Sequence, residues 1–232
     1  MELEQVKDKS WELIPVYRLD AHKCILLDTG LVEQRGELQE ALTNYGLEPV
    51  GVICSHAHID HMGNVAYLKE KYGAKLAMSL GEAGHQMSYL GLNVTSYLLP
   101  PEDLESWDAV QGTPCLADRI ILPTEDHITF CGAEFDIVHT PGHTVDHICT
   151  RTADNVLYLG DAMMKFPFPF RVRDYLDSMR KMRSEPADKF IVAHFGVYDE
   201  ILPLVDMEAR FFAERMLDLL DLIDQPTDPK KL

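Results

Sequence analysis

Residues 50–61 read Val50-Gly51-Val52-Ile53-Cys54-Ser55-His56-Ala57-His58-Ile59-Asp60-His61. The first half is an apolar run typical of a buried strand, and the second half places three imidazoles and a carboxylate within six residues. Polar groups crowded beside a buried strand are costly unless something binds them. Because imidazole nitrogens and carboxylate oxygens together suit transition metals, the stretch predicts a metal site on a loop at a strand end.

The pattern His-x-His-x-Asp-His after an apolar strand resembles the signature of the metallo-β-lactamase superfamily. Further landmarks of that family occur in the expected order, one before the stretch and three after it: Leu27-Asp28-Thr29-Gly30, Thr140-Pro141-Gly142-His143-Thr144, Leu159-Gly160-Asp161, and His194 directly after Phe190-Ile191-Val192-Ala193. The resemblance extends over residues 11–198, which is most of the chain.

The resemblance implies a four-layer αββα sandwich, whereas periodicity alone supports only a mixed α/β protein. We expect one domain over residues 1–232, because this length and 46% hydrophobic content suit a single large core. The residue patterns predict strands at 17–27, 50–55, 75–78, 120–122, 128–130, 135–138, 147–152, 156–159 and 190–193. They predict helices at 33–45, 64–72, 175–183 and about 201–224, the last packed on the domain. Residues 81–118 follow no clear period and are interpreted as an inserted wall of the active site.

The resemblance also implies a ligand set for two divalent metal ions. In dinuclear members, one ion takes two histidines of the motif and a third from the Gly-His loop, here His56, His58 and His143. The second ion takes the Asp-His pair and a distal histidine, here Asp60, His61 and His194. An aspartate at a strand end bridges both ions, here Asp161. Nitrogen-rich ligation makes zinc the expected metal, with iron or manganese as alternatives.

Two such ions explain the chemistry expected of the family. Ions about 3.5–4 Å apart share a bridging hydroxide and stabilise the oxyanion that forms when it attacks a carbonyl carbon. Asp60 is the candidate catalytic side chain, because it could orient the water or pass its proton to the leaving group. We therefore expect a dinuclear metallohydrolase acting on a small ester, most readily a thioester, as in glyoxalase II, or a lactone.

Several residues near the motif are expected to support the site. Asp28 and Thr29 should brace the motif loop, and His139 and His147 should hydrogen-bond to a ligand, direct ligation being the alternative for both histidines. The segment Phe166-Pro167-Phe168-Pro169-Phe170 leaves aromatic rings on an irregular segment. We expect Phe166 and Phe168 to form a substrate wall or a homodimer contact, and Tyr198 to bind substrate or to pack the sheet edge.

Composition narrows the partners. The net charge of −17 repels phosphate backbones, so we expect a small-molecule substrate and no nucleic acid. We expect no signal peptide, because residues 1–10 are charged and lack an apolar stretch, and we expect no membrane span, because no run is long and apolar enough. Five cysteines without a C-x-x-C pair fit reduced thiols and a cytoplasmic location.

The motif leaves two alternative functions open. A metal-dependent phosphodiesterase or nuclease uses the same ligands, although the negative charge disfavours it. A persulfide dioxygenase-like oxidoreductase with a single iron is the other alternative. Flavodiiron reductases fit less well, because they carry a glutamate where this chain has His58.

Overall fold

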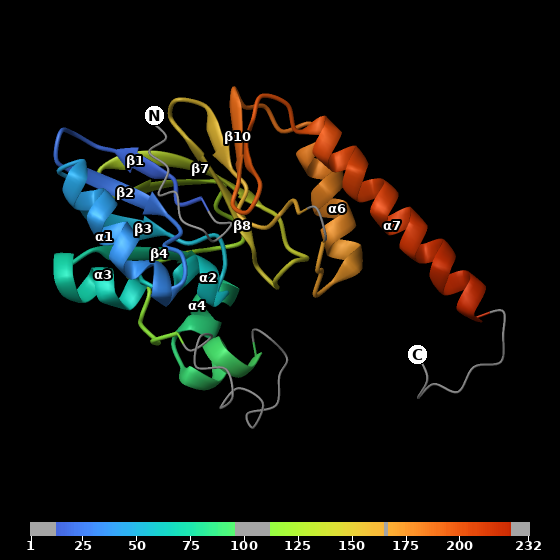
Figure 1. Ribbon diagram of the computed structural model, residues 1–232, viewed down its shortest axis with the longest axis horizontal. Coiled ribbons are helices and arrows are strands. Elements are labelled where there is room, and N and C mark those ends of the chain that lie inside the picture. The colour runs from blue at the N-terminus through green and yellow to red at the C-terminus, as the bar shows by residue number, and fades with distance from the viewer. Residues whose placement is uncertain (1–12, 96–111, 165–166, 224–232) are drawn as a thin grey trace.

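The computed structural model of the chain describes residues 13–95, 112–164 and 167–223. In these ranges the chain forms a five-stranded sheet and a six-stranded sheet packed face to face, with helices on the outer side of each (Figure 1). This arrangement confirms the four-layer αββα sandwich that the resemblance predicts.

The first sheet has the strand order β1-β2-β3-β4-β5. Its strands are β1 (Val16–Arg18), β2 (Lys23–Leu27), β3 (Glu48–Ile53), β4 (Lys75–Ser79) and β5 (Arg119–Ile121). β1 and β2 are antiparallel, and the other neighbours are parallel. Parallel neighbours need crossover connections, which are provided by η1 (Val32–Gln34), α1 (Arg35–Asn44), α2 (Ile59–Met62) and α3 (Val65–Tyr72).

The second sheet has the order β11-β10-β9-β8-β7-β6. Its strands are β6 (His127–Phe130), β7 (Ala133–His139), β8 (Ile148–Thr152), β9 (Val156–Tyr158), β10 (Lys189–Val192) and β11 (Gly196–Tyr198). Only β9 and β10 pair in parallel. The helix between these two strands is α6 (Val172–Met182), and α7 (Leu202–Ile223) follows β11.

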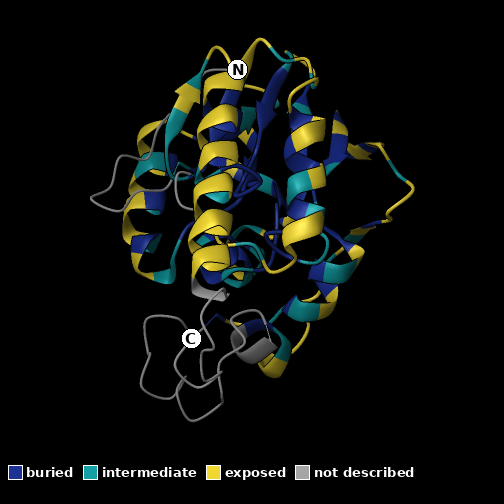
Figure 2. Cartoon of the chain, turned by 90° about the vertical axis from the view of Figure 1, so that its right-hand side faces the viewer, coloured by how far each residue is buried: buried dark blue, intermediate teal, exposed yellow. Residues whose placement is uncertain are grey.

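Alternation along the strands builds three separate apolar layers. In β2, Leu26 points to the cluster shared with α1 and α3, whereas Ile25 and Leu27 point to the cluster between the sheets. In β9, Tyr158 faces the layer between the sheets and Leu157 faces α6 and α7. Successive side chains of a strand point to opposite faces, so each sheet is buried on both sides. Figure 2 shows buried strands behind helices whose outer faces are exposed.

Two parts of the chain, the stretch at 81–118 and the end of the second sheet, differ from the sequence-based expectations. The stretch interpreted as an irregular wall begins with α4 (Leu80–Gln86) and η2 (Leu90–Thr95), while residues 96–111 lie outside the described ranges. Strand β11 was not predicted, because its three residues are too few to show a period. Its backbone nevertheless pairs with β10.

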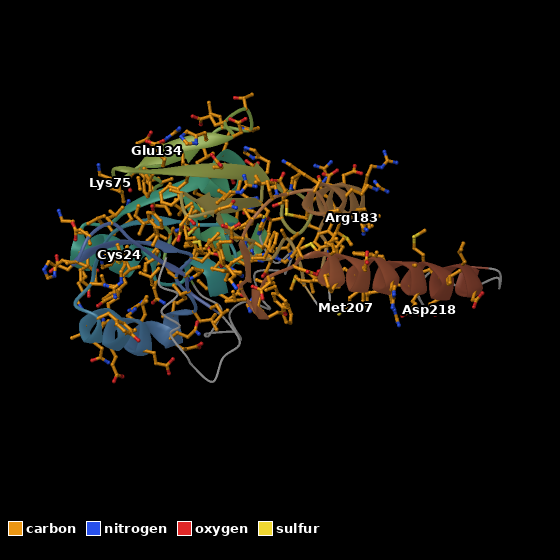
Figure 3. The ribbon with its side chains drawn as sticks, turned by 90° about the horizontal axis from the view of Figure 1, so that it is seen from above. Cys24, Lys75, Glu134, Arg183, Met207 and Asp218 are labelled. Carbon is orange, nitrogen blue, oxygen red and sulfur yellow. The ribbon has the colours of Figure 1, made fainter. Side chains whose placement is uncertain are left out.

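The C-terminal helix is the longest of the described elements. Its first turn packs on the domain through Leu204 and Val205, which are buried with residues of α6 and with Ile201 directly before the helix. Figure 3 shows its later turns running out beyond the sheets, with Met207 and Asp218 along it. None of the helices in the described part of the chain has the length and hydropathy needed to cross a bilayer.

Candidate metal centre

The predicted metal ligands lie where the two sheets present strand ends to each other. The motif loop follows β3, His143 follows β7, Asp161 follows β9 and His194 follows β10. Ligand sites in α/β folds form at the carboxyl ends of strands, because the loops that begin there converge. Residues 138 positions apart, from His56 to His194, thus enter one cluster.

Three imidazole nitrogens meet on one side of this cluster. His56 Nε2 lies 2.9 Å from His58 Nδ1, and His143 Nε2 lies 3.0 Å from the same His58 nitrogen. His56 is fully buried and His143 is 5% exposed, so these nitrogens are largely shielded from bulk water. The structure therefore brings together the three residues expected to hold the first ion.

A second group lies on the other side. Asp60 Oδ2 is 3.7 Å from His61 Nε2 and 3.5 Å from His194 Nε2. Asp161 lies between the two groups: its Oδ2 is 3.3 Å from His143 Nε2 and 3.4 Å from His61 Nε2, and its Oδ1 is 3.3 Å from His194 Nε2. Asp161 thus has the position that a bridging carboxylate requires.

Hydrogen bonds on the outer side of the rings determine which nitrogen faces inward. His61 Nδ1 lies 2.8 Å from Asp28 Oδ2, and His143 Nδ1 lies 3.1 Å from the backbone oxygen of Phe168. A carboxylate or carbonyl oxygen only accepts, so both Nδ1 atoms carry the proton and both Nε2 atoms present a lone pair to the cluster. Such outer partners are typical of metal-binding histidines.

His56 is oriented through Ser55. The hydroxyl of Ser55 donates its only proton to Asp28 Oδ2 at 2.6 Å, so its oxygen accepts the hydrogen bond from His56 Nδ1 at 2.9 Å. Asp28 Oδ1 also accepts from the backbone N–H of Ser55 at 2.7 Å. Thr29 braces the same loop, because its hydroxyl donates to the carbonyl of His61 and accepts from the N–H of Asn64. Asp28 and Thr29 therefore lie around the ligands, as expected.

His147 lies beneath the cluster and contacts the Asp161 segment. Its Nε2 accepts the backbone N–H of Asp161 at 3.2 Å, which leaves the proton on Nδ1 to be donated to the hydroxyl of Thr140 at 2.8 Å. Gly160 precedes Asp161 with φ of 50°, and a Cβ atom there would lie 2.6 Å from Ser55 Oγ and 2.8 Å from His147 Nε2. The glycine of the Leu-Gly-Asp landmark thus permits both the turn and this close packing.

His139 differs from the expectation that it would hydrogen-bond to a ligand. Its Nε2 donates to the backbone oxygen of Glu125 at 2.9 Å, and its Nδ1 is 4.0 Å from Asp146 Oδ1. Those two neighbours lie away from the cluster because His139 still belongs to β7, four residues before His143. Among the described residues, His139 therefore hydrogen-bonds to the backbone of Glu125 and not to a metal ligand.

The residues proposed to bind substrate are placed unevenly. Phe166 lies outside the described residues. The ring of Phe168 is 78% exposed while its backbone oxygen contacts His143, so this residue stands beside the metal centre. The hydroxyl of Tyr198 donates to the backbone oxygen of Phe195 at 3.1 Å, and its ring packs against the cluster under α6 and α7. This contact favours the structural alternative for Tyr198.

Sequence reasoning missed Glu82, Ser55 and Tyr158. Glu82 is fully buried on α4, and its two oxygens accept the backbone N–H groups of Ala57 and Asp146 at 2.9 and 3.0 Å. It thereby ties the motif loop to the loop that follows His143. The hydroxyl of Tyr158 donates to Asp28 Oδ2 at 2.6 Å from the opposite sheet. A glutamate in an aperiodic stretch gives no sequence signal for such a role, whereas Ser55 adjoins the motif.

The electrostatics of the cluster suit a cation. Burial lowers the pKa of His56 well below its ordinary value, and neighbouring imidazoles lower it further. Burial also lowers the pKa of His58, and it lowers that of His143 to about 4 although Asp161 opposes it. These rings are neutral near pH 7, which is the form that binds metal.

Asp60 and Asp161 are the negatively charged groups of the cluster, and they raise the pKa of a neighbouring histidine. Burial raises the pKa of Asp60, but His61 and His194 outweigh burial and lower the pKa to about 2. Burial lowers the pKa of His194, yet its hydrogen bonds to Asp161 and Asp60 raise it to about 10. A proton on His194 therefore balances these carboxylates when no metal cation does, and metal binding has to displace it.

The donor set fits two ions of the size and preference of zinc. Bonds of about 2.0–2.1 Å in tetrahedral geometry put neighbouring ligand atoms about 3.4 Å apart. The donor–donor distances given above range from 2.9 to 3.7 Å, close to that value, and the donor atoms of each group all lie within 4.8 Å of one another. His56, His58 and His143 would hold one ion, Asp60, His61 and His194 the other, and Asp161 would contact both.

Comparison with known proteins gives the same family. The sequence model described as the metallo-beta-lactamase superfamily matches residues 15–194. A hydroxyacylglutathione hydrolase of Cereibacter sphaeroides (strain ATCC 17025 / ATH 2.4.3) is 28% identical over 182 residues, covering 75% of this chain and 60% of that protein. A hydroxyacylglutathione hydrolase of Enterobacter sp. (strain 638) is 25% identical over 144 residues, covering 62% and 44%. The chain thus spans less than two thirds of these curated relatives.

Solved structures show the same fold. A metallo-beta-lactamase family protein from Thermus thermophilus is similar with a TM-score of 0.73 and 21% identity, covering 93% of this chain and 79% of that one. BJP-1, a subclass B3 metallo-beta-lactamase of Bradyrhizobium japonicum, is similar with a TM-score of 0.67 and 17% identity, covering 91% and 90%. At these identities the similarity extends to architecture and not to substrate.

The geometry predicts about two zinc ions per chain at saturation, because seven donors exceed the four that one tetrahedral ion uses. Elemental analysis of protein loaded with zinc and freed of excess metal measures the ratio. A single ion per chain, with Asp60 and His194 unbound in a crystal of the loaded protein, would contradict the dinuclear assignment.

Replacing Asp161 should weaken zinc binding more than replacing His139. Asp161→Ala removes the carboxylate between the two groups, and we expect a loss beyond the roughly 10- to 100-fold that removal of an outer partner costs. His139→Ala should change affinity only a few-fold, since His139 bonds to Glu125. Calorimetric titration of the metal-free variants compares them, and equal losses would show that the assignment of the two residues is wrong.

Proposed function

The chain belongs to the metallo-β-lactamase superfamily of enzymes, and on that premise we propose that it is a dinuclear zinc hydrolase that cleaves a small carbonyl ester, with a thioester as the first candidate and a lactone as the second. The observation that carries the proposal is Asp161, which lies between two groups of converging donors. When bound there, two ions lower the pKa of water towards neutrality and stabilise a developing oxyanion.

The side chains of the chain have distinct parts in this proposal. The outer bonds to Asp28, Ser55 and the Phe168 carbonyl keep the imidazole lone pairs directed at the centre. Asp60 is 32% exposed whereas Asp161 is 4% exposed, so Asp60 is the carboxylate that a substrate can reach. With a pKa of about 2 it is ionised at neutral pH. It is therefore suited to accept a hydrogen bond from the attacking water or a proton for the leaving group.

The preference for a thioester rests on the relatives. Two similar proteins are named hydroxyacylglutathione hydrolases, and a hydroxyacylglutathione is a thioester. At 28% and 25% identity, the resemblance supports a proposal for the type of bond that is cleaved. It gives less support for the identity of the alcohol or thiol part of the substrate. A small-molecule substrate also agrees with the net charge of −17, which repels extended polyanions.

A phosphodiesterase or nuclease receives less support. The most basic stretch of the sequence lies on α6, where several cations contact acidic side chains. Arg171 Nε is 2.9 Å from Asp174, Arg180 pairs with Asp177, and Arg183 is 2.6 Å from Asp206. Cations that are already paired in this way offer little attraction to a phosphate backbone. The mononuclear iron alternative would use only one of the two donor groups.

Substrate ranking tests the proposal. The zinc-loaded protein should cleave a hydroxyacyl thioester or a lactone with a higher kcat/KM than bis-p-nitrophenyl phosphate, for the reasons of charge and relatedness given above. Asp60→Asn keeps the size of the side chain and removes its charge, so a loss of turnover in this variant shows that the measured cleavage occurs at this site. A phosphodiester that exceeds every carbonyl substrate would favour the nuclease alternative, and consumption of oxygen with a persulfide by the iron-loaded protein would favour the dioxygenase.

A second prediction concerns Phe168, which is exposed and lies beside the metal centre. Phe168→Ala should raise KM for substrates with an apolar acyl group by about tenfold, because one aromatic contact contributes roughly 1.5 kcal/mol. Zinc content should stay unchanged, since the contact with His143 uses the backbone oxygen. Tyr45→Ala is the control, as Tyr45 is also exposed but precedes β3, at the opposite end of that strand. An unchanged KM would remove Phe168 from the substrate wall.

A further inference from the structure

Glu208 is a carboxyl group in an apolar layer. It lies in α7 and is 0% exposed, next to the cluster formed by Tyr175, Leu204 and Val205. Burial raises its pKa to about 8, although hydrogen bonds from Met164 and Tyr175 oppose the rise. A leucine or methionine would fill the same position without the cost of burying a polar carboxyl group. Packing alone therefore does not explain why a carboxyl group occupies position 208.

The first contact of Glu208 is with the segment after Asp161. Its Oε1 accepts the backbone N–H of Met164, three residues beyond Asp161. Four residues further on, the backbone oxygen of Phe168 accepts the hydrogen bond from His143. Glu208 thus fixes a point between two contacts of the metal centre, namely the bridging carboxylate and the outer partner of a ligand.

The second contact leads to the loop that carries His143. Glu208 Oε2 accepts the hydroxyl of Tyr175 at 3.1 Å, and Tyr175 lies in α6. The backbone of Tyr175 packs so closely on Gly142 that a Cβ atom at Gly142 would overlap it. Gly142, with φ of 136°, directly precedes His143. The position of α6 therefore constrains the position of His143, the metal ligand that follows Gly142.

We propose that Glu208 is a positioning residue that holds, from the C-terminal helix, the two loops that carry Asp161 and His143. Its hydrogen bonds within the described residues are to Met164 and Tyr175, and it acts on the metal ligands through these two residues. The inference rests on the proposed metal centre and extends it. It makes α7 a part of the site although the helix lies on the outer face of the second sheet.

The test separates positioning from packing. Glu208→Leu places an apolar side chain in an apolar layer, and burial of that side chain offsets the two lost hydrogen bonds, so its thermal unfolding midpoint should stay close to that of the wild type. The same variant should bind zinc about 10- to 100-fold more weakly, because both loops lose their common anchor. Glu208→Gln retains an acceptor for Met164 and a polar partner for Tyr175, and it should recover affinity to within a few-fold.

Calorimetric titration of the metal-free protein with zinc provides the readout. Glu214→Leu is the matched control, because Glu214 lies on the same helix and is exposed. Wild-type zinc affinity in folded Glu208→Leu would overturn the proposal. If that variant fails to fold, Tyr175→Phe decides: several-fold weaker binding supports the proposal and unchanged binding overturns it. The titration needs no substrate, so failure of the ester hydrolase proposal would appear separately, as two bound ions without turnover.

Discussion

The carboxylate of Asp28 is fully buried where the two sheets meet, and it accepts hydrogen bonds from both of them. Ser55 and His61 donate to it from the segment after β3, and Tyr158 donates from β9 of the opposite sheet. Loss of one partner of a buried charge typically costs about 3–5 kcal/mol. The carboxylate of Asp28 therefore both joins the two halves of the fold and orients the metal-binding rings of His56 and His61.

The motif loop and the strand before it could be predicted because their signals lie within a short stretch of sequence. The donors of the motif occupy six residues, and the strand before them is a short apolar run with turn signals on either side. The distant ligands could be assigned only by resemblance, since nothing in the spacing of His143 or His194 shows that they approach His56. In the second sheet β7 and β9 are both antiparallel to β8, and β9 is parallel to β10, so these three strands run in the same direction. The loops that follow them, which carry His143, Asp161 and His194, therefore lie at one edge of the sheet.

The residues that the sequence did not identify were missed for the same physical reason. Glu82, Tyr158 and Glu208 act through contacts with residues 25 or more positions away, and each looks ordinary among its sequence neighbours. His139 shows the converse error, because proximity in sequence to His143 suggested a role that strand geometry removes. Side chains that orient ligands are chosen by the tertiary fold, so a single sequence identifies the ligands more readily than their partners.

The charge of the site follows from the same residues. Asp28, Asp60 and Asp161 contact the imidazoles of the cluster and supply three negative charges, while the ligating rings are neutral in the form that binds metal. Two divalent cations held there would add positive charge beside the carbonyl group of a bound substrate. Positive charge at that place stabilises an oxyanion as it forms, whereas the net charge of −17 on the whole chain discourages large polyanions. The two effects together favour a small carbonyl substrate that acquires its negative charge only as it reacts.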